Sequence, residues 1–210
     1  MAELPYVGCG TMASSLTMDK EKTKQIWENA GLAVVPYICA KKYEAETDEG
    51  LSSLEEKSKN QFGYPVFIKP CCAGSSVGAS KAANKEEFEK SIKEAFSWDD
   101  KILIEPFIKA REIECSVIGN EKQISFIPCE ILPTHEFYDY EAKYKDPDGA
   151  SFSIPANLNE EQIAQVKTIA EKAYKVLDAS GLSRVDFFID KDNGNLMFNE
   201  INTMPGFSSI

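Results

Sequence analysis

The chain has 210 residues, of which 23 are Lys or Arg and 34 are Asp or Glu, so its formal net charge is −11 at pH 7. A nucleic-acid backbone or an anionic membrane would repel such a chain, and we expect neither as a partner. The composition, 43% hydrophobic and 27% charged, is that of a globular protein. The sequence shows no membrane span and no signal sequence, which predicts a cytoplasmic location.

The six cysteines show neither C-x-x-C spacing nor the density of a disulfide scaffold. We therefore expect free thiols. Cys71 and Cys72 are adjacent, but His135 is the only histidine and no second ligand pair completes a tetrahedral metal site. His135 is expected to be a solvated loop residue.

The expected elements alternate between helices and short strands along the chain. Asp19 predicts the N-cap of a helix over 20–30, which Gly31 ends. Asn84 with Glu87, and Asn159 with Gln162, predict capping boxes for two further helices. The other expected elements are a helix over 51–60 and strands over 34–39, 65–69, 77–81, 101–107, 112–118, 123–132, 183–189 and 196–202. Several hairpins mixed with helices indicate an α+β fold.

The last hairpin carries the most informative chemistry. If residues 192–194 form a three-residue loop, Arg184 faces Asn202 and Asp186 faces Glu200. Because side chains alternate along a strand, all four then project from one face of the hairpin. Two carboxylates and an amide oxygen suit Mg²⁺. From the hairpin alone, a solvated ion-pair network is an equally good interpretation.

A small-residue loop offers a second candidate site. The run Gly74-Ser75-Ser76-Val77-Gly78 supplies backbone N–H groups and hydroxyls that can close over phosphates, and Lys69 supplies a positive charge from the preceding strand. It is no Walker loop, and a plain flexible hairpin is the alternative. Ser75 has no recognisable His/Asp relay, which disfavours a hydrolase triad.

The end of the strand over 101–107 is a candidate adenosine site. Glu105, Phe107 and Ile108, followed by Glu112, combine acids and an aromatic ring with exposed backbone, which can hydrogen-bond an adenine and a ribose. An apolar edge strand flanked by solvated acids is the alternative.

Together these motifs resemble the D-alanine:D-alanine ligases of the ATP-grasp superfamily. The resemblance covers nearly the whole chain in family order. It rests on Pro5-Tyr6-Val7-Gly8-Cys9-Gly10, Met18-Asp19-Lys20, Phe67-Ile68-Lys69-Pro70, Gly74-Ser75-Ser76-Val77-Gly78, Phe137-Tyr138-Asp139-Tyr140-Glu141-Ala142-Lys143-Tyr144, Ser183-Arg184-Val185-Asp186 and Asn199-Glu200-Ile201-Asn202-Thr203-Met204-Pro205-Gly206.

The resemblance implies an α+β ATP-grasp fold, with two α+β subdomains gripping ATP between them. It assigns 1–18 to the tail of a missing N-terminal domain and a linker, 19–110 to the central subdomain, and 111–210 to a C-terminal subdomain truncated at its end. The family is commonly homodimeric.

The resemblance also implies roles for individual residues. The ATP phosphates would be bound by Lys20, Lys69, Ser75, Ser76 and Lys143. The adenosine would be held by Glu105, Phe107, Ile108 and Glu112. Two Mg²⁺ ions, with Mn²⁺ as a substitute, would be coordinated by Asp186, Glu200 and Asn202. The substrate oxyanion would be bound by Arg184 and the Gly206 backbone. The catalytic residues would be Ser75, Tyr144 and Arg184, with Lys143 and Tyr144 on a loop that closes over the site.

The implied reaction joins two D-alanines to D-alanyl-D-alanine through an acyl phosphate, for peptidoglycan precursor synthesis. Relatives from vancomycin-resistant bacteria use D-serine or D-lactate as the second substrate, and that choice stays open. Because the family's N-terminal domain and closing helices are absent from this sequence, we expect the fragment to be inactive, or at most a noncatalytic Mg-ATP-binding piece.

Overall fold

The computed structural model describes residue 4 and residues 6–133 and 150–206. The chain divides into two compact units, each of which is built from separate stretches of sequence. Unit 1 comprises Met1–Val34, Ala110–Leu132 and Ser151–Ile210, and unit 2 comprises Val35–Lys109 and Pro133–Ala150. Residues 19–34 thus belong to unit 1, whereas the expected division groups them with the central subdomain. The subdomain assignment itself stays a prediction.

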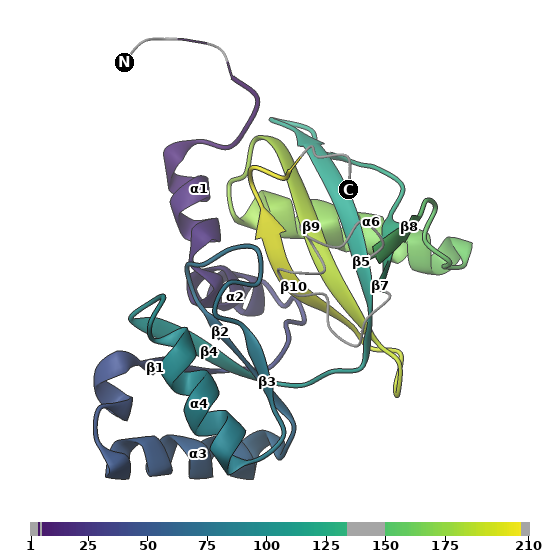
Figure 1. The fold of residues 1–210 in the computed structure, drawn as a ribbon. Coiled ribbons are helices and arrows are strands. Elements are labelled where there is room, and N and C mark those ends of the chain that lie inside the picture. Colours follow the sequence, from purple (N-terminus) through teal and green to yellow (C-terminus); the bar gives the residue numbers. More distant parts are fainter. Residues whose placement is uncertain (1–3, 5, 134–149, 207–210) are drawn as a thin grey trace. The chain divides into compact units, whose positions relative to one another are not determined.

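Unit 2 contains a four-stranded antiparallel sheet with one helical face (Figure 1). In sheet order its strands are β1 (Ile38–Lys41), β4 (Lys101–Pro106), β2 (Val66–Pro70) and β3 (Ser80–Ala82). A 3-10 turn η1 (Lys42–Ala45) and helices α3 (Asp48–Phe62) and α4 (Lys85–Ala95) complete the unit. The core lies between the sheet and the two helices and includes Val66, Ile68, Ile102, Ile104, Leu54, Phe88 and Ile92.

Local signals explain where these helices begin and end. The Thr47 side chain accepts a hydrogen bond from Gly50 N–H at the start of α3, and Gly63, with φ of 72°, follows its end. Asn84 caps α4 as expected by accepting from Glu87 N–H. The Glu87 carboxylate accepts from Ala83 N–H at 2.8 Å, one residue before the N-cap. Both caps satisfy donors that a helix leaves unpaired at its first turn.

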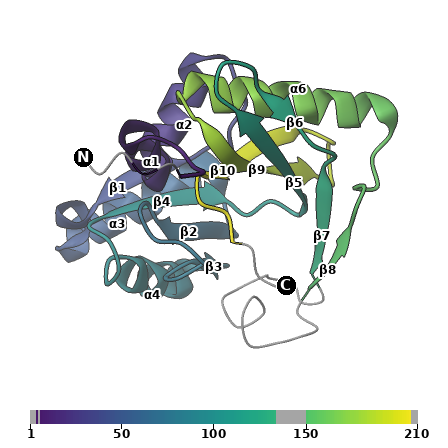
Figure 2. The same cartoon turned by 90° about the horizontal axis from the view of Figure 1, so that it is seen from above.

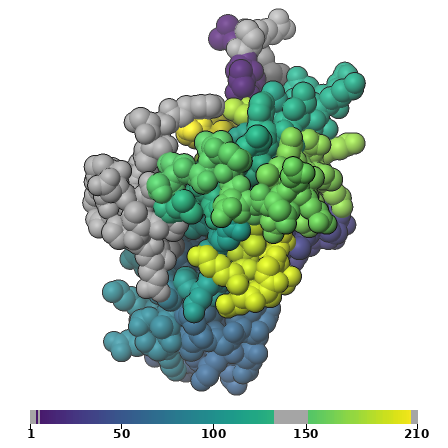
Figure 3. Space-filling view, turned by 90° about the vertical axis from the view of Figure 1, so that its right-hand side faces the viewer, coloured from purple at the N-terminus to yellow at the C-terminus, as the bar shows by residue number. Residues whose placement is uncertain are grey.

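Unit 1 contains a six-stranded sheet crossed by one long helix (Figure 2). The sheet order is β10 (Leu196–Asn202), β9 (Gly181–Asp190), β5 (Ala110–Gly119), β7 (Cys129–Pro133) and β8 (Ala150–Ser153), and β6 (Ile124–Ser125) also pairs with β5. The helices are α1 (Thr11–Met18), α2 (Lys20–Asn29) and α6 (Glu160–Val176). Helix α6 buries Val166, Ala170, Ala173 and Tyr174, and the green segment that contains it presents its outer side in Figure 3.

An aromatic cluster joins α2 to the sheet of unit 1. The Phe198 ring lies 4.7 Å, between centroids, from both Trp27 and Phe187. Trp27 is fully buried, and its Nε1–H donates to the Ala173 carbonyl at 3.2 Å. The indole therefore packs as an apolar body while its single polar group is satisfied. This packing anchors α2 on the sheet, and Lys20 is the first residue of this helix.

Several elements differ from those expected from the sequence. The expected strand over 77–81 is the shorter β3, because residues 75–78 form turns. Helix α1 was not predicted, although Ala13 and Thr17 give it a buried side. The expected strand over 123–132 is interrupted between β6 and β7, where Pro128 has no N–H to donate to a ladder.

The pairing within the last hairpin is confirmed, but through a different turn. Asp190 N–H donates to the Asn195 carbonyl, and Gly194 N–H donates back to the Asp190 carbonyl, so the loop is longer than three residues. This turn alone would shift the partners of Asp186 by one position. A β-bulge between Phe198 and Glu200 restores the pairs Glu200 with Asp186 and Asn202 with Arg184.

The six cysteines are free thiols, as expected. Among the described residues, we find no helix with the length and apolar character needed to cross a bilayer.

Candidate functional site

The sheet of unit 1 has a polar face opposite α6. Along β9, Val185 and Phe187 are buried, whereas Arg184 and Asp186 alternate with them and are only half-buried. Strand pairing places Glu200 and Glu114 on either side of Asp186. The next row pairs Arg184 with Asn202 and Ser116. The predicted juxtaposition of the charged hairpin residues is therefore confirmed, and β5 adds Glu114 to it.

Arg184 is the centre of the hydrogen bonds on this face. Its Nε donates to Asp186 Oδ1 at 2.7 Å and its Nη2 donates to Asp186 Oδ2 at 2.8 Å. Its Nε also lies 3.1 Å from Glu114 Oε1. Asn202 Nδ2 donates to Asp186 Oδ2 at 2.9 Å. Four side chains from three strands thus form one connected network.

The electrostatics of the network keep Arg184 charged. Burial alone would lower the pKa of Arg184, but the neighbouring carboxylates of Asp186, Glu114 and Glu200 outweigh it and raise the pKa above its ordinary value. Such a cation, held by carboxylates on a sheet face, can stabilise negative charge that develops on a bound substrate.

Lys20 extends the polar face at the start of α2. Asp19 caps this helix by accepting from Lys22 N–H, as predicted. The Lys20 Nζ lies 3.6 Å from Glu200 Oε2, and only 13% of the Lys20 side chain is exposed. Lys20 thus joins Arg184 as a second cation beside the carboxylates of this side of the sheet.

Three further residues flank this network. Glu112 precedes Glu114 by two positions on β5, so it shares the polar face, and Phe188 is its partner on β9. Cys129 faces Glu114 from β7, and burial followed by the Glu114 carboxylate raises the pKa of its thiol. Gly206, the expected oxyanion donor, is exposed beyond the end of β10.

In unit 2, Lys69 and Glu105 form a buried ion pair. The Lys69 Nζ lies 2.9 Å from Glu105 Oε2, and the two side chains are 9% and 3% exposed. They project from the sheet face opposite the core, because Ile68 and Ile104 alternate with them. The charged atoms are thus held by the strands rather than by mobile loops. β4 lies between β1 and β2, so the alternative interpretation of this segment as an apolar edge strand is wrong.

The small-residue loop after β2 contains unusual backbone conformations. Ser75 and Ser76 have φ of 53° and 58°, in the left-handed region that non-glycine residues rarely adopt. Gly78 also has positive φ, and a Cβ there would lie 2.6 Å from the Trp98 ring. Such strain clusters at ligand-binding loops.

Phe107 and Ile108 are half-buried and directly follow β4. The Lys81 Nζ lies 4.2 Å from the centroid of the Phe107 ring, a cation–π arrangement. The Phe107 N–H donates to the Pro65 carbonyl at 3.1 Å, so this donor is engaged within unit 2. The predicted residues Lys143, Tyr144 and His135 lie outside the described residues.

The oxygen donors of the polar face suit a divalent metal ion that also binds phosphate and water. Nowhere in residues 6–133 and 150–206 do three His, Cys, Asp or Glu side chains form a ready metal cage. Asp186, Glu200 and Asn202 instead offer few, hard oxygens on neighbouring strands. Mg²⁺ accepts such a set because phosphate and water oxygens complete its shell.

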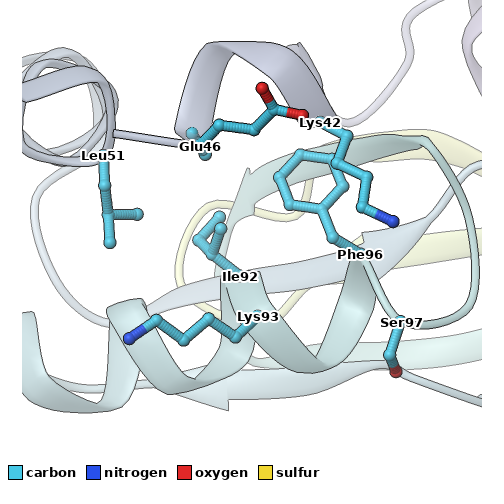
Figure 4. A pocket seen from close by; sticks show the side chains of 8 residues that line it. Lys42, Glu46, Leu51, Ile92, Lys93, Phe96 and Ser97 are labelled. Carbon is cyan, nitrogen blue, oxygen red and sulfur yellow. The ribbon is translucent and has the colours of Figure 1, made fainter. Parts of the chain in front are cut away.

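A separate hollow of about 360 Å³ lies in unit 2 among η1, α3 and α4 (Figure 4). Leu51, Ile92 and Phe96 form its apolar lining, with Lys42, Lys93 and Glu46 among the polar residues. No residue expected at the site lines this hollow.

Glu114 is the site residue that sequence reasoning missed. The run Arg111-Glu112-Ile113-Glu114 alternates acids with Ile113, which signals that both acids share one strand face. The signal does not identify the strand beside β5, so the pairing with Arg184 could not be anticipated.

Comparison with known proteins explains this combination of fold and polar face. The family model described as D-ala D-ala ligase C-terminus matches residues 26–210. A D-alanine–D-alanine ligase of Treponema denticola is 54% identical over the whole chain, which covers 57% of that protein.

Two solved structures are also similar over 99% of the chain. The D-alanine–D-alanine ligase of Coxiella burnetii is 33% identical with a TM-score of 0.79, and the chain covers 53% of it. The VanG D-Ala:D-Ser ligase of Enterococcus faecalis is 36% identical with a TM-score of 0.83, and the chain covers 58% of it. The chain thus spans little more than half the length of these relatives, and its fold is the α+β ATP-grasp fold. The chain belongs to the D-alanine–D-alanine ligase family and matches its C-terminal part.

Proposed function

We propose that this chain carries the ATP- and metal-binding part of an enzyme that joins two D-alanines for peptidoglycan precursor synthesis, in the cytoplasm. The observation that carries the proposal is the 54% identity to a D-alanine–D-alanine ligase along all 210 residues. Arg184, Asp186, Glu200 and Asn202 on one sheet face supply a charge distribution suited to the reaction.

In this proposal, the carboxylate of the first D-alanine attacks the γ-phosphate of ATP, and the amine of the second attacks the resulting acyl phosphate. Lys20 and Lys69 bind phosphate oxygens, and Ser75 and Ser76 close over them through backbone N–H and hydroxyl groups. Such transfer depends mainly on positioning and on stabilisation of negative charge. The positive φ of Ser75 and Ser76 supports this role, because backbone strain of this kind clusters at ligand-binding loops.

Arg184 and the Gly206 backbone are proposed to stabilise the oxyanion of the tetrahedral intermediate. The raised pKa of Arg184 supports this role, since the guanidinium stays charged throughout the reaction. Asp186, Glu200 and Asn202 would hold two Mg²⁺ ions, which supply charge neutralisation to the phosphates. Glu105, Phe107, Ile108 and Glu112 would hold the adenosine. Ser75 and Tyr144 are the further proposed catalytic residues, and Lys143 is a further proposed phosphate-binding residue. The proposed assembly is a homodimer.

D-Alanine is the proposed second substrate. The 54% identity to the Treponema D-alanine–D-alanine ligase supports this choice. Identity to the solved structures does not separate the two classes, because VanG is 36% and the Coxiella D-alanine–D-alanine ligase is 33% identical. The residues 141–144, which resemble the D-alanine enzymes, lie outside the described residues and provide no geometry.

The test is phosphate release from ATP and Mg²⁺ in the presence of D-alanine, alone or mixed with D-serine or D-lactate. The 210-residue chain is compared with the chain extended to its full reading frame. Turnover that depends on D-alanine and falls at least about 100-fold in Lys69→Met supports the proposal. Absence of D-amino-acid-dependent turnover in both forms contradicts it.

A further inference from the structure

The Asp186 carboxylate is shared between two groups. Both of its oxygens accept hydrogen bonds from Arg184, at 2.7 and 2.8 Å, and Oδ2 also accepts from Asn202. A divalent ion bound to Asp186 draws electron density from the same two oxygens, and its charge repels a guanidinium held against them. The bidentate contact with Arg184 and full ligation of a metal ion are therefore in competition.

Glu114 offers Arg184 a second acceptor. Arg184 Nε is 3.1 Å from Glu114 Oε1. In the sheet, Glu114 faces Asp186 from β5, whereas Glu200 faces it from β10. The second acceptor is thus on the strand opposite the one that carries the other proposed metal ligands.

Burial makes this second acceptor necessary. The Arg184 side chain is 27% exposed and the Glu114 side chain is 18% exposed. If the largely buried Arg184 guanidinium lost its hydrogen bonds to Asp186 and gained no other acceptor, its desolvation would not be compensated. A charged acceptor already within hydrogen-bond distance removes that cost.

We propose that Glu114 is a positioning residue, which holds the Arg184 guanidinium when a divalent metal ion binds Asp186. The inference rests on the proposed function, because that function assigns the metal role to Asp186. When Asp186 ligates the metal ion, the Arg184 guanidinium moves toward Glu114. Its charge then stays close to the carboxyl group of the first D-alanine. Glu114 touches neither metal ion nor substrate in this role.

The proposal predicts energetic coupling between Glu114 and Arg184 in metal binding. In Glu114→Gln, Arg184 loses the charged second acceptor to which it would move when a metal ion binds Asp186, so the Mn²⁺ affinity falls about tenfold, within the range measured for contacting residues. In Arg184→Met no displacement is needed, and adding Glu114→Gln changes the affinity less than about twofold. Glu130→Gln, on the other face of the sheet, leaves the affinity unchanged.

The measurement is titration of the 210-residue chain with Mn²⁺ in the presence of a non-hydrolysable ATP analogue, with free Mn²⁺ quantified by electron paramagnetic resonance. Glu114→Asp separates position from charge, because its carboxylate keeps the charge but is one methylene shorter. Positioning predicts that Glu114→Asp also weakens binding severalfold. Circular dichroism establishes that each variant is folded. If Glu114→Gln is unfolded, Glu114→Asp replaces it as the test variant.

Two results would overturn the proposal, and they differ. In the first, Glu114→Gln lowers the Mn²⁺ affinity equally in the unaltered chain and in Arg184→Met, and Glu114→Asp leaves the affinity unchanged. This result would show that Glu114 acts only by its charge. That result leaves the proposed function intact. Absence of Mn²⁺ binding to the unaltered chain would overturn the metal assignment and the role of Glu114 with it.

Discussion

The six-stranded sheet of unit 1 carries an arginine paired with glutamate on each face, and the surroundings of the two arginines differ. On the α6 face, Arg111 donates from Nε and Nη2 to the two oxygens of Glu130, both at 2.7 Å. Arg111 Nη2 also donates to the Asn157 carbonyl, and Asn157 N–H donates back to Glu130. This pair is a local, mutually satisfied unit.

On the polar face, Arg184 is surrounded by the carboxylates of Asp186, Glu114 and Glu200. One guanidinium cannot neutralise three carboxylates, and part of the remaining charge is met by Lys20. Three partly buried carboxylates gathered on one face attract a further cation. The comparison teaches that charge balance, rather than the presence of an ion pair, distinguishes a structural pair from a candidate metal site.

The largest expected effect is on metal binding by the polar face. Asp186→Asn should lower the Mn²⁺ affinity of the chain with bound nucleotide by about 100-fold, because a charged ligand is replaced by a neutral one. Titration followed by electron paramagnetic resonance measures the change. Glu130→Gln is the matched control and should bind Mn²⁺ as the unaltered chain does. Equal losses in both variants would contradict the distinction between the two faces.

The next effect is on the free energy of unfolding. Here a substitution on the α6 face should have a larger effect than one on the polar face. Glu130→Gln should lower the free energy of unfolding by about 2 kcal/mol at pH 7, because it leaves Arg111 without its carboxylate. Glu114→Gln should cost less than about 1 kcal/mol, since Arg184 retains Asp186. Urea unfolding of both variants gives the comparison. A larger loss in Glu114→Gln would show that the polar face is the more structural one.

The polar face could be predicted from the sequence to a large extent because its information is local. Alternation along β9 and β10 and the chemistry of the side chains are enough to place Arg184, Asp186, Glu200 and Asn202 together. The exact loop was not predictable, because the turn and the bulge near Asn199 compensate each other. The correct pairs were therefore obtained from an incorrect turn.

Other features depend on contacts between distant parts of the chain. Glu114 reaches Arg184 only because β5 is the neighbour of β9, and no local pattern encodes that choice. Helix α1 has a weak apolar pattern, and its buried Thr17 hydrogen-bonds Thr203 at 3.2 Å, far along the sequence. Tertiary contacts thus determine what the local pattern leaves open.

A smaller effect is the pH dependence of the stability that the Arg111–Glu130 ion pair contributes. The hydrogen bond from Arg111 holds the pKa of Glu130 below its ordinary value near 4.5. Its contribution to stability is therefore complete above that value and is lost as the pH falls through the lowered pKa of the folded state. The difference in unfolding free energy between the unaltered chain and Glu130→Gln should be constant from pH 7 to about 5 and narrow below about 4.5. Urea titrations at several pH values test this, and a difference that widened in acid would contradict the assigned sign.

The smallest expected effect concerns Lys20, whose ion pair is longer than either arginine pair. The Lys20 Nζ is 3.6 Å from Glu200 Oε2, and the Glu200 side chain is 32% exposed. Water and salt screen such a pair, so Lys20→Met should change the unfolding free energy by less than about 0.5 kcal/mol. If Lys20 binds phosphate as proposed, the same variant should weaken binding of a fluorescent ATP analogue about tenfold. A loss of stability as large as that of Glu130→Gln, with nucleotide affinity unchanged, would place Lys20 among the structural pairs instead.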